Sequence, residues 1–288
     1  MNLQPFCSTI ESSPVPPSLK LGKVSPFPPQ AGQPYPPARN HPEWRATPGA
    51  DFNRMIWAAR LTGIYFLTDD YMDVDNQFDR ISGFKRAAEA PGLENLLHPE
   101  DKAEISHHIV FAQIKKDLPP DTFKQLVKLV WEWWDSHVHE PFKTLDQYLR
   151  HRRFNNGIVT WSRYALGINL SDEEIFHPLM REAEAITADH AGLTNDYFSY
   201  LKEKLSNSDD TNIIRFLIEH QGCDYTEAMK MVAEKIQQKE KDFITAGLAV
   251  INDPVLGRNP EVYRWVCNLP YVMGASKAWS QTVCVVSC

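Results

Sequence analysis

From residue 51 onward, apolar side chains recur at steps of three and four residues, and this period constrains the fold more than any other feature. The first run places Phe52, Met55, Ile56, Ala59 and Phe66 along one line. Such steps match the turn of an α-helix, so these side chains share one face. No stretch alternates apolar and polar residues between hairpin turns, as a half-buried strand would. The pattern therefore predicts an all-α protein.

The same period continues along the chain and is interrupted by residues that end helices, such as Pro91-Gly92 and Pro119-Pro120. We expect roughly ten helices in one bundle. The expected helices lie near residues 51–70, 77–90, 101–116, 121–139, 144–154, 157–168, 172–189, 192–205, 210–221, 225–251 and 260–280.

The N-terminal segment differs from the rest because 12 of the 21 prolines lie in residues 1–48. Proline fixes φ and removes a backbone donor, so this segment should be extended or disordered, or form a strap over the core. We therefore place the helical domain at residues 49–282.

Charge and composition exclude some functions. The net charge is -7 and the basic residues are dispersed, so we expect no nucleic-acid surface. The five cysteines are far apart, no window reaches eighteen apolar residues, and no signal peptide is evident. We expect a cytosolic protein with reduced thiols and no membrane span, either a monomer or a homodimer.

Three oxygen-bearing residues, Asn195, Ser199 and Glu203, recur at four-residue steps. On a helix this spacing aligns an amide oxygen, a hydroxyl and a carboxylate on one stripe. Mg2+ prefers oxygen ligands and keeps positions for water and phosphate, so the stripe suits a metal that also holds a diphosphate. A solvated helix face is the alternative.

A second acidic stretch, Asp69-Asp70-Tyr71-Met72-Asp73, ends the first apolar run. Its carboxylates repel one another and raise one another's pKa unless a positive charge lies among them. A solvated helix end could tolerate this, but a bound metal explains it more simply.

Four basic residues, Arg150 to Arg153, precede a predicted break at Gly157. Cations are favoured at a helix C-terminus, which explains the run without any function. Alternatively, Arg153 turns inward as a fork for phosphate oxygens.

Histidines and tryptophans give no sign of a site. His107 and His108 are adjacent and His137 and His139 are two apart, so neither pair has the four-residue spacing of a helical zinc pair. We expect surface or half-buried side chains. Trp131, Trp133 and Trp134 should pack in the core and between helices.

The two oxygen-rich stretches, in this order and with the arginine-rich break between them, resemble the class I terpene synthases of the fungal and bacterial single-domain type. That family carries a DDxxD motif and a later NDxxSxxxE motif, which face each other across a deep apolar cavity. Residues 69–73 and 195–203 match both motifs completely. The resemblance covers about residues 41–282 and implies the class I terpenoid synthase fold.

The resemblance also implies the metal ligands. Three Mg2+ ions are expected, of which Asp69, with Asp73, would hold two. Asn195, Ser199 and Glu203 would hold the third.

Matching positions between the motifs imply further roles. Arg153 stands where the family has its diphosphate-sensing arginine, with Asn156 as the linker and Gly157 as the effector. Arg153 and Lys202 would contact the diphosphate.

The implied reaction is the ionisation and cyclisation of a linear isoprenyl diphosphate, with farnesyl diphosphate favoured. The product would be a terpene hydrocarbon or alcohol. Aromatic faces stabilise a cation, and we expect Phe66 and Trp279 in the cavity wall.

The C-terminal end departs from the family pattern. The family's last helix reads Trp-Ser-x-x-Ser/Thr-x-Arg-Tyr, whereas this chain has Val285 and Val286 in the Arg-Tyr positions. We regard residues 283–288 as an atypical tail, as a truncated or misspliced end would give, and expect weakened activity.

Two alternatives remain open from the sequence. A chain-elongating prenyltransferase shares the helical fold and the metal, but would carry a second aspartate-rich motif in place of residues 195–203. A non-catalytic diphosphate-binding or truncated product is the other.

Overall fold

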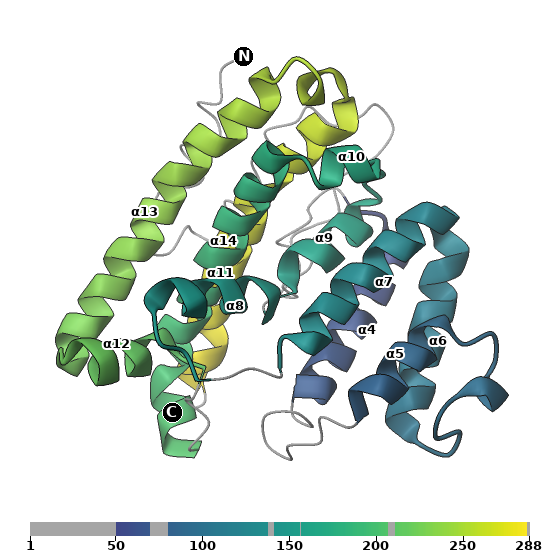
Figure 1. The fold of residues 1–288 in the computed structure, drawn as a ribbon, viewed down its shortest axis with the longest axis horizontal. Coiled ribbons are helices and arrows are strands. Elements are labelled where there is room, and N and C mark those ends of the chain that lie inside the picture. Colours follow the sequence, from purple (N-terminus) through teal and green to yellow (C-terminus); the bar gives the residue numbers. More distant parts are fainter. Residues whose placement is uncertain (1–49, 70–79, 138–140, 156, 207–210, 287–288) are drawn as a thin grey trace. The chain divides into compact units, whose positions relative to one another are not determined.

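The computed structural model describes residues 50–69, 80–137, 141–155, 157–206 and 211–286 (Figure 1). Among these residues all regular structure is helical and no strand occurs, which confirms the all-α prediction. The elements are α4 (Phe52–Asp69), α5 (Ile81–Glu89), η3 (Leu93–Asn95), α6 (Lys102–Asp117), α7 (Pro120–Asp135), α8 (Leu145–Asn155), α9 (Ile158–Leu166), α10 (Asp172–Ile175), α11 (Pro178–Ser206), α12 (Ile213–Gln221), α13 (Tyr225–Asn252), η4 (Leu256–Arg258) and α14 (Pro260–Val286).

The described residues fall into two compact units. One comprises residues 50–141 and 160–169 and holds α4 to α7 with most of α9. The other comprises residues 142–159 and 170–286 and holds α8 and α10 to α14. The predicted domain limits at residues 48 and 282 stay predictions, and the proline-rich segment lies outside the described residues.

In the first unit, helices α5, α6 and α7 pack around large aromatic side chains. Trp134, Phe84 and Phe111 are fully buried, and the ring of Trp134 lies 6.2 Å from each of the other two. Trp133 is also buried and stacks on Tyr65 of α4, with ring centroids 4.3 Å apart. The predicted core role of Trp133 and Trp134 is confirmed, whereas Trp131, predicted with them, is half-buried.

The histidine prediction was wrong for two residues, because His107 and His137 are both buried. His107 stacks on Phe84 and lies 2.7 Å through Nδ1 from the carbonyl oxygen of Ala103. Its Nε2 lies 3.2 Å from the hydroxyl of Thr68. Burial lowers the pKa of His107 to about 4, so the ring is neutral, Nδ1 donates its proton and Nε2 accepts. These two hydrogen-bond partners offset the cost of burying the imidazole. The apolar period of the sequence cannot predict such partners.

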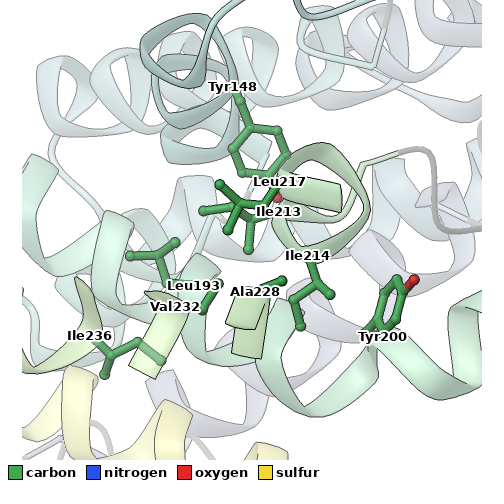
Figure 2. Close-up of a cluster of buried hydrophobic side chains, with 9 residues drawn as sticks. All are labelled: Tyr148, Leu193, Tyr200, Ile213, Ile214, Leu217, Ala228, Val232 and Ile236. Carbon is green, nitrogen blue, oxygen red and sulfur yellow. The ribbon is translucent and has the colours of Figure 1, made fainter. Parts of the chain in front are cut away.

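In the second unit, α11 is the central helix, and α13 and α14 pack against it (Figure 1). Helices α8 and α12 also contact α11. Figure 2 shows the buried apolar cluster that joins α8, α11, α12 and α13. It consists of Tyr148, Leu193, Tyr200, Ile213, Ile214, Leu217, Ala228, Val232 and Ile236.

Local signals set the ends of α12 and α13. The side chain of Asn212 accepts a hydrogen bond from the amide of Ile214 and so caps the start of α12. Gly222 ends that helix with φ of 68°, a left-handed conformation that glycine adopts without a Cβ penalty. Asp224 and Glu227 then form a capping box at the start of α13.

The prediction of separate helices at residues 172–189 and 192–205 was wrong. The chain instead forms the short helix α10 and, from Pro178, the continuous 29-residue helix α11. Proline suits the first turn of a helix because its missing N–H has no partner there, so Pro178 starts α11. Gly192, by contrast, lies buried within the helix and does not interrupt it.

Helix α14 was predicted to end near residue 280, but it continues to Val286 with Pro270 inside it. The atypical tail is therefore helical over residues 283–286.

The buried, neutral His107 predicts how stability depends on pH. As pH falls below 6.5, the ordinary pKa of histidine, the unfolded chain takes up a proton that the folded chain resists until about pH 4. The free energy of unfolding should therefore fall by roughly 3 kcal/mol over that window through this residue alone.

Urea unfolding followed by tryptophan fluorescence at pH 7.5, 6, 5 and 4.5 measures this effect. His107→Asn, which cannot titrate in this range, should lose less stability between pH 6.5 and 4.5 than the wild type does. Equal losses in the two proteins would contradict the assignment.

Candidate metal site on helix α11

The three predicted oxygen ligands all lie on α11, at the four-residue spacing that puts them on one stripe. Asn195 and Glu203 are half-buried, and Ser199 between them is buried, with 5% of its surface exposed. The structure therefore brings this part of the predicted site together within one helix.

Asn195 is held by the guanidinium of Arg152, from α8. Nη2 of Arg152 donates to Oδ1 of Asn195 at 2.7 Å, and Nε and Nη2 both donate to Oδ1 of Asp196, at 3.0 and 2.8 Å. The carboxylate of Asp196 neutralises the arginine, so the guanidinium does not place a net charge beside Asn195. A carbonyl oxygen has two lone pairs and can accept this hydrogen bond while it also binds a cation.

Asp196 is fully buried and takes its donors from two helices, α8 and α12. Besides Arg152, the hydroxyl of Tyr148 on α8 and the amide of Ile213 on α12 donate to its Oδ2. Burial raises the pKa of Asp196, whereas Arg152 and these donors act in the opposite direction by stabilising the charged form. The pKa of Tyr148 is raised, chiefly by burial and then by the negative charge of Asp196, so the phenol keeps its proton and donates.

Glu203 is held by Asn212, whose Nδ2 donates to Oε2 of Glu203 at 2.8 Å. Burial raises the pKa of Glu203, and the neighbouring Ser199 hydroxyl and the Asn212 amide partly offset that rise. Two of the predicted ligands, Asn195 and Glu203, are thus each oriented by a side chain from another element.

The donor set fits a hard divalent cation. Oγ of Ser199 is buried, and no group within the described part of the chain forms a well-oriented hydrogen bond with it; its interaction with the Glu203 carboxylate is a weaker one. A buried polar atom that is poorly hydrogen-bonded costs free energy, which a cation bound by this oxygen and its neighbours on the stripe would recover. An amide, a hydroxyl and a carboxylate together supply the oxygen ligands that Mg2+ prefers.

Arg153 forms a separate ion pair on the same side of α11. Its Nε and Nη2 donate to the two oxygens of Asp189 at 2.6 and 2.9 Å, and Lys239 of α13 donates to Oδ2 at 2.7 Å. Asp189 is fully buried. The hydrogen bonds to Asp189 raise the pKa of Arg153. The guanidinium of Arg153, predicted to point inward and bind phosphate oxygens, therefore binds the carboxylate of Asp189 in this structure.

Gly157 follows α8 and has φ of 61°, which fits the predicted break before α9. The chain thus turns a short distance after the two anchored arginines. Asn156, the predicted linker, lies outside the described residues.

The structure describes only some of the other predicted site residues. Asp69 and Phe66 lie in α4, in the other unit, and the structure describes their backbone but not their side chains. Asp73 lies outside the described residues. Lys202 is exposed on α11, and Trp279 is half-buried on α14. Their predicted roles stay predictions.

The sequence reasoning missed the residues that hold the ligands in place. Tyr148 and Arg152 are four residues apart on α8, and Asp189 and Asp196 are seven apart on α11, so each pair shares a helix face. That spacing was visible in the sequence. Residues 210–214 fall where the resembled family has similar residues, but the partners of Asn212 could not be predicted from spacing, since they are distant in the chain or become neighbours only when α12 forms.

A family model described as "Terpene synthase family 2, C-terminal metal binding" matches residues 60–242. This range is about 64% of the chain and contains both predicted metal motifs. The chain belongs to terpene synthase family 2. Membership of a metal-binding family supports the use of a divalent metal.

Terpene synthases from a fungus and a lycophyte are among its relatives. Sesquiterpene synthase 14 of Postia placenta is 27% identical over 217 residues, which cover 69% of this chain and 60% of that protein. Microbial Terpene synthase-like protein 1 of Selaginella moellendorffii is 30% identical over 259 residues, which cover 81% of this chain and 72% of that protein. The chain spans only 30% of some longer relatives.

Solved structures show the same fold. The 2-methylisoborneol synthase of Streptomyces coelicolor A3(2), in complex with Mg2+ and 2-fluoroneryl diphosphate, superimposes with a TM-score of 0.74 at 17% identity. The match covers 84% of this chain and 80% of that one. The predicted class I terpenoid synthase fold is therefore confirmed.

Among the described residues of this chain, no helix combines the length and the hydropathy that a membrane span requires.

The ion pairs of Asp189 predict an asymmetry between partners. Asp189→Asn should lower the free energy of unfolding by about 3 kcal/mol, because it removes the one anion that serves two cations. Arg153→Gln should cost less, since Lys239 still pairs with the buried carboxylate and Arg153 is one third exposed.

Urea unfolding of the purified variants measures both values. Asp146→Asn is a matched control, because Asp146 pairs with Arg150 on the exposed face of α8 and should change stability by less than about 0.5 kcal/mol. A smaller cost for Asp189→Asn than for Arg153→Gln would refute the buried-anion account.

Proposed function

We propose that this chain is a Mg2+-dependent terpene synthase that ionises and cyclises a linear isoprenyl diphosphate, with farnesyl diphosphate as the favoured substrate. The observation that carries the proposal is the oxygen stripe on α11, with the buried hydroxyl of Ser199 between an amide and a carboxylate. Membership of a metal-binding terpene synthase family supports it.

In this proposal Asn195, Ser199 and Glu203 hold one of three Mg2+ ions, and Asp69 with Asp73 holds the other two. Bound Mg2+ would stabilise the negative charge that develops on the departing diphosphate. The chain's own part is to fix the ligands, as Arg152 does for Asn195.

Arg153 and Lys202 would bind the diphosphate oxygens. A guanidinium that binds both oxygens of Asp189 has the planar geometry that also suits a phosphate group. Lys239 shares Asp189, so the aspartate keeps a cationic partner if Arg153 turns to the substrate. Lys202 is exposed on the same helix as the metal ligands and can reach an anion from solvent.

After the diphosphate leaves, the carbocation must be kept from water. We propose that Phe66 and Trp279 face it, since an aromatic ring attracts a cation by about 1 to 2 kcal/mol when water is excluded. Exclusion of water would favour a hydrocarbon, whereas water that reaches the cation would give an alcohol.

A fifteen-carbon substrate is favoured because two of the relatives are named sesquiterpene synthases. We propose a cytosolic location, since isoprenyl diphosphates are charged and water-soluble at one end and the described helices include no candidate membrane span.

The decisive assay incubates purified protein with farnesyl or geranylgeranyl diphosphate and Mg2+, and analyses the volatile products by gas chromatography and mass spectrometry. We expect a terpene from farnesyl diphosphate, and none when a chelator removes the metal. An arm with added isopentenyl diphosphate distinguishes a chain-elongating prenyltransferase, which would release a longer diphosphate.

Two glutamate variants serve as a matched pair in this assay. Glu203→Gln should lower turnover by at least about 100-fold, the scale of losing a charged metal ligand and its electrostatic stabilisation. Glu219→Gln, on the exposed face of α12, should leave turnover unchanged. If neither diphosphate gives a hydrocarbon or an alcohol, the proposed function fails for this protein.

The C-terminal helix offers a second test. Because α14 continues through Val286, the double substitution Val285→Arg, Val286→Tyr places the family's Arg-Tyr pair on a helix that already exists. Each new hydrogen bond to phosphate contributes about 1.5 to 3 kcal/mol, so turnover should rise by about ten- to a hundredfold per bond. The ratio of kcat values for the variant and the wild type measures the gain, and a ratio of one or less would show that the pair is not needed here.

A further inference from the structure

Asn212 lies directly before α12 and is fully buried, yet it carries no role in the function proposed above. Its side chain makes three hydrogen bonds. Nδ2 donates to Oε2 of Glu203 at 2.8 Å and to the backbone oxygen of Asp196 at 3.0 Å, and Oδ1 accepts from the amide of Ile214 at 2.9 Å.

These bonds leave Asn212 little freedom. An amide side chain offers two donor hydrogens and an acceptor oxygen, and here both hydrogens and the oxygen are used. Since one hydrogen is fixed by the backbone of α11 and the oxygen by the start of α12, the other hydrogen can point in one direction only. That direction is toward the carboxylate of Glu203.

The geometry therefore ties one candidate metal ligand to two pieces of rigid backbone. Glu203 lies near the C-terminal end of α11, where a long side chain would otherwise sample several rotamers. A hydrogen bond from a buried amide selects one of them. Metal sites depend on such partners, because ligands that are already oriented bind with less loss of entropy.

We propose that Asn212 is a positioning residue for the metal site, which orients the carboxylate of Glu203 for the cation while its oxygen caps α12. The inference rests on the proposed function, because it assigns Asn212 to the same site. Asn212 does not itself touch the metal or the substrate in this scheme.

A merely structural role is the competing explanation, since Asn212 also caps a helix. The two roles separate in Asn212→Ser, because serine is as good an N-cap as asparagine but is too short to reach Glu203. Asn212→Thr is the second variant, in case the serine variant does not fold, since threonine also caps and fills more of the space.

The test measures the rise in melting temperature that Mg2+ produces in the presence of inorganic diphosphate, as a function of Mg2+ concentration. We expect Asn212→Ser to raise the half-saturating Mg2+ concentration by about tenfold, the scale of a hydrogen bond to a charged group. The readout needs no catalytic turnover, so it does not depend on the product.

Asp224→Ala controls for the loss of a helix cap nearby. Asp224 caps α13 in the same unit without contacting a predicted ligand, so this variant should melt earlier but keep the wild-type half-saturation. The double variant Asn212→Ser, Glu203→Gln completes a double-mutant cycle with the two single variants. If Asn212 acts through the Glu203 carboxylate, Asn212→Ser should change half-saturation by less than about twofold in that background.

The outcomes separate this inference from the function on which it rests. A wild-type protein that shows no stabilisation by Mg2+ and diphosphate overturns both. If Asn212→Ser and Asn212→Thr both keep the wild-type half-saturating Mg2+ concentration, the positioning role alone is overturned. It is also overturned if Asn212→Ser raises that concentration as much in the Glu203→Gln background as it does in the wild type.

Discussion

The candidate site depends on the hydrogen bonds that the buried carboxylate of Asp196 accepts. It lies one residue after the first predicted metal ligand and receives hydrogen bonds from Tyr148 and Arg152 on α8 and from the amide of Ile213 on α12. An ionised carboxylate is expensive to bury unless donors replace its water. The ends of α8 and α12 must therefore be in place around α11 before this charge is compensated, and one of the donors, Arg152, then also holds Asn195.

A second acid one heptad earlier extends this arrangement. Asp189 and Asp196 lie on the same face of α11, and the consecutive arginines of α8 bind one each, Arg153 the former and Arg152 the latter. Two ion pairs fix the end of a helix in rotation as well as in position, which one pair cannot do. The end of α8 is thus anchored just before the chain turns at Gly157.

Much of this could be predicted from the sequence, for identifiable reasons. Helix positions follow from the apolar period, and the ligand trio follows from a four-residue spacing that any α-helix imposes. The partners of the trio could not be predicted, because the contact of Arg152 with Asn195 joins residues 43 apart and depends on how two helices pack. The predicted break between residues 189 and 192 was wrong for a related reason, since the packing of neighbouring helices around the buried Gly192 outweighs the low helix propensity of glycine.

The charges around α11 also explain why a metal here would call for an anionic ligand. Arg152 and Asp196 cancel, so among the trio only Glu203 contributes a negative charge, while Asn195 and Ser199 are neutral. A divalent cation bound by these three oxygens keeps a positive excess, and Arg153 with Lys239 outweighs Asp189 by one further positive charge. In a partly buried site such an excess is weakly screened and attracts an anion strongly. In the proposed function the helix would therefore supply enough oxygen to hold the metal but too little charge to neutralise it, which is the condition under which a diphosphate would complete the site.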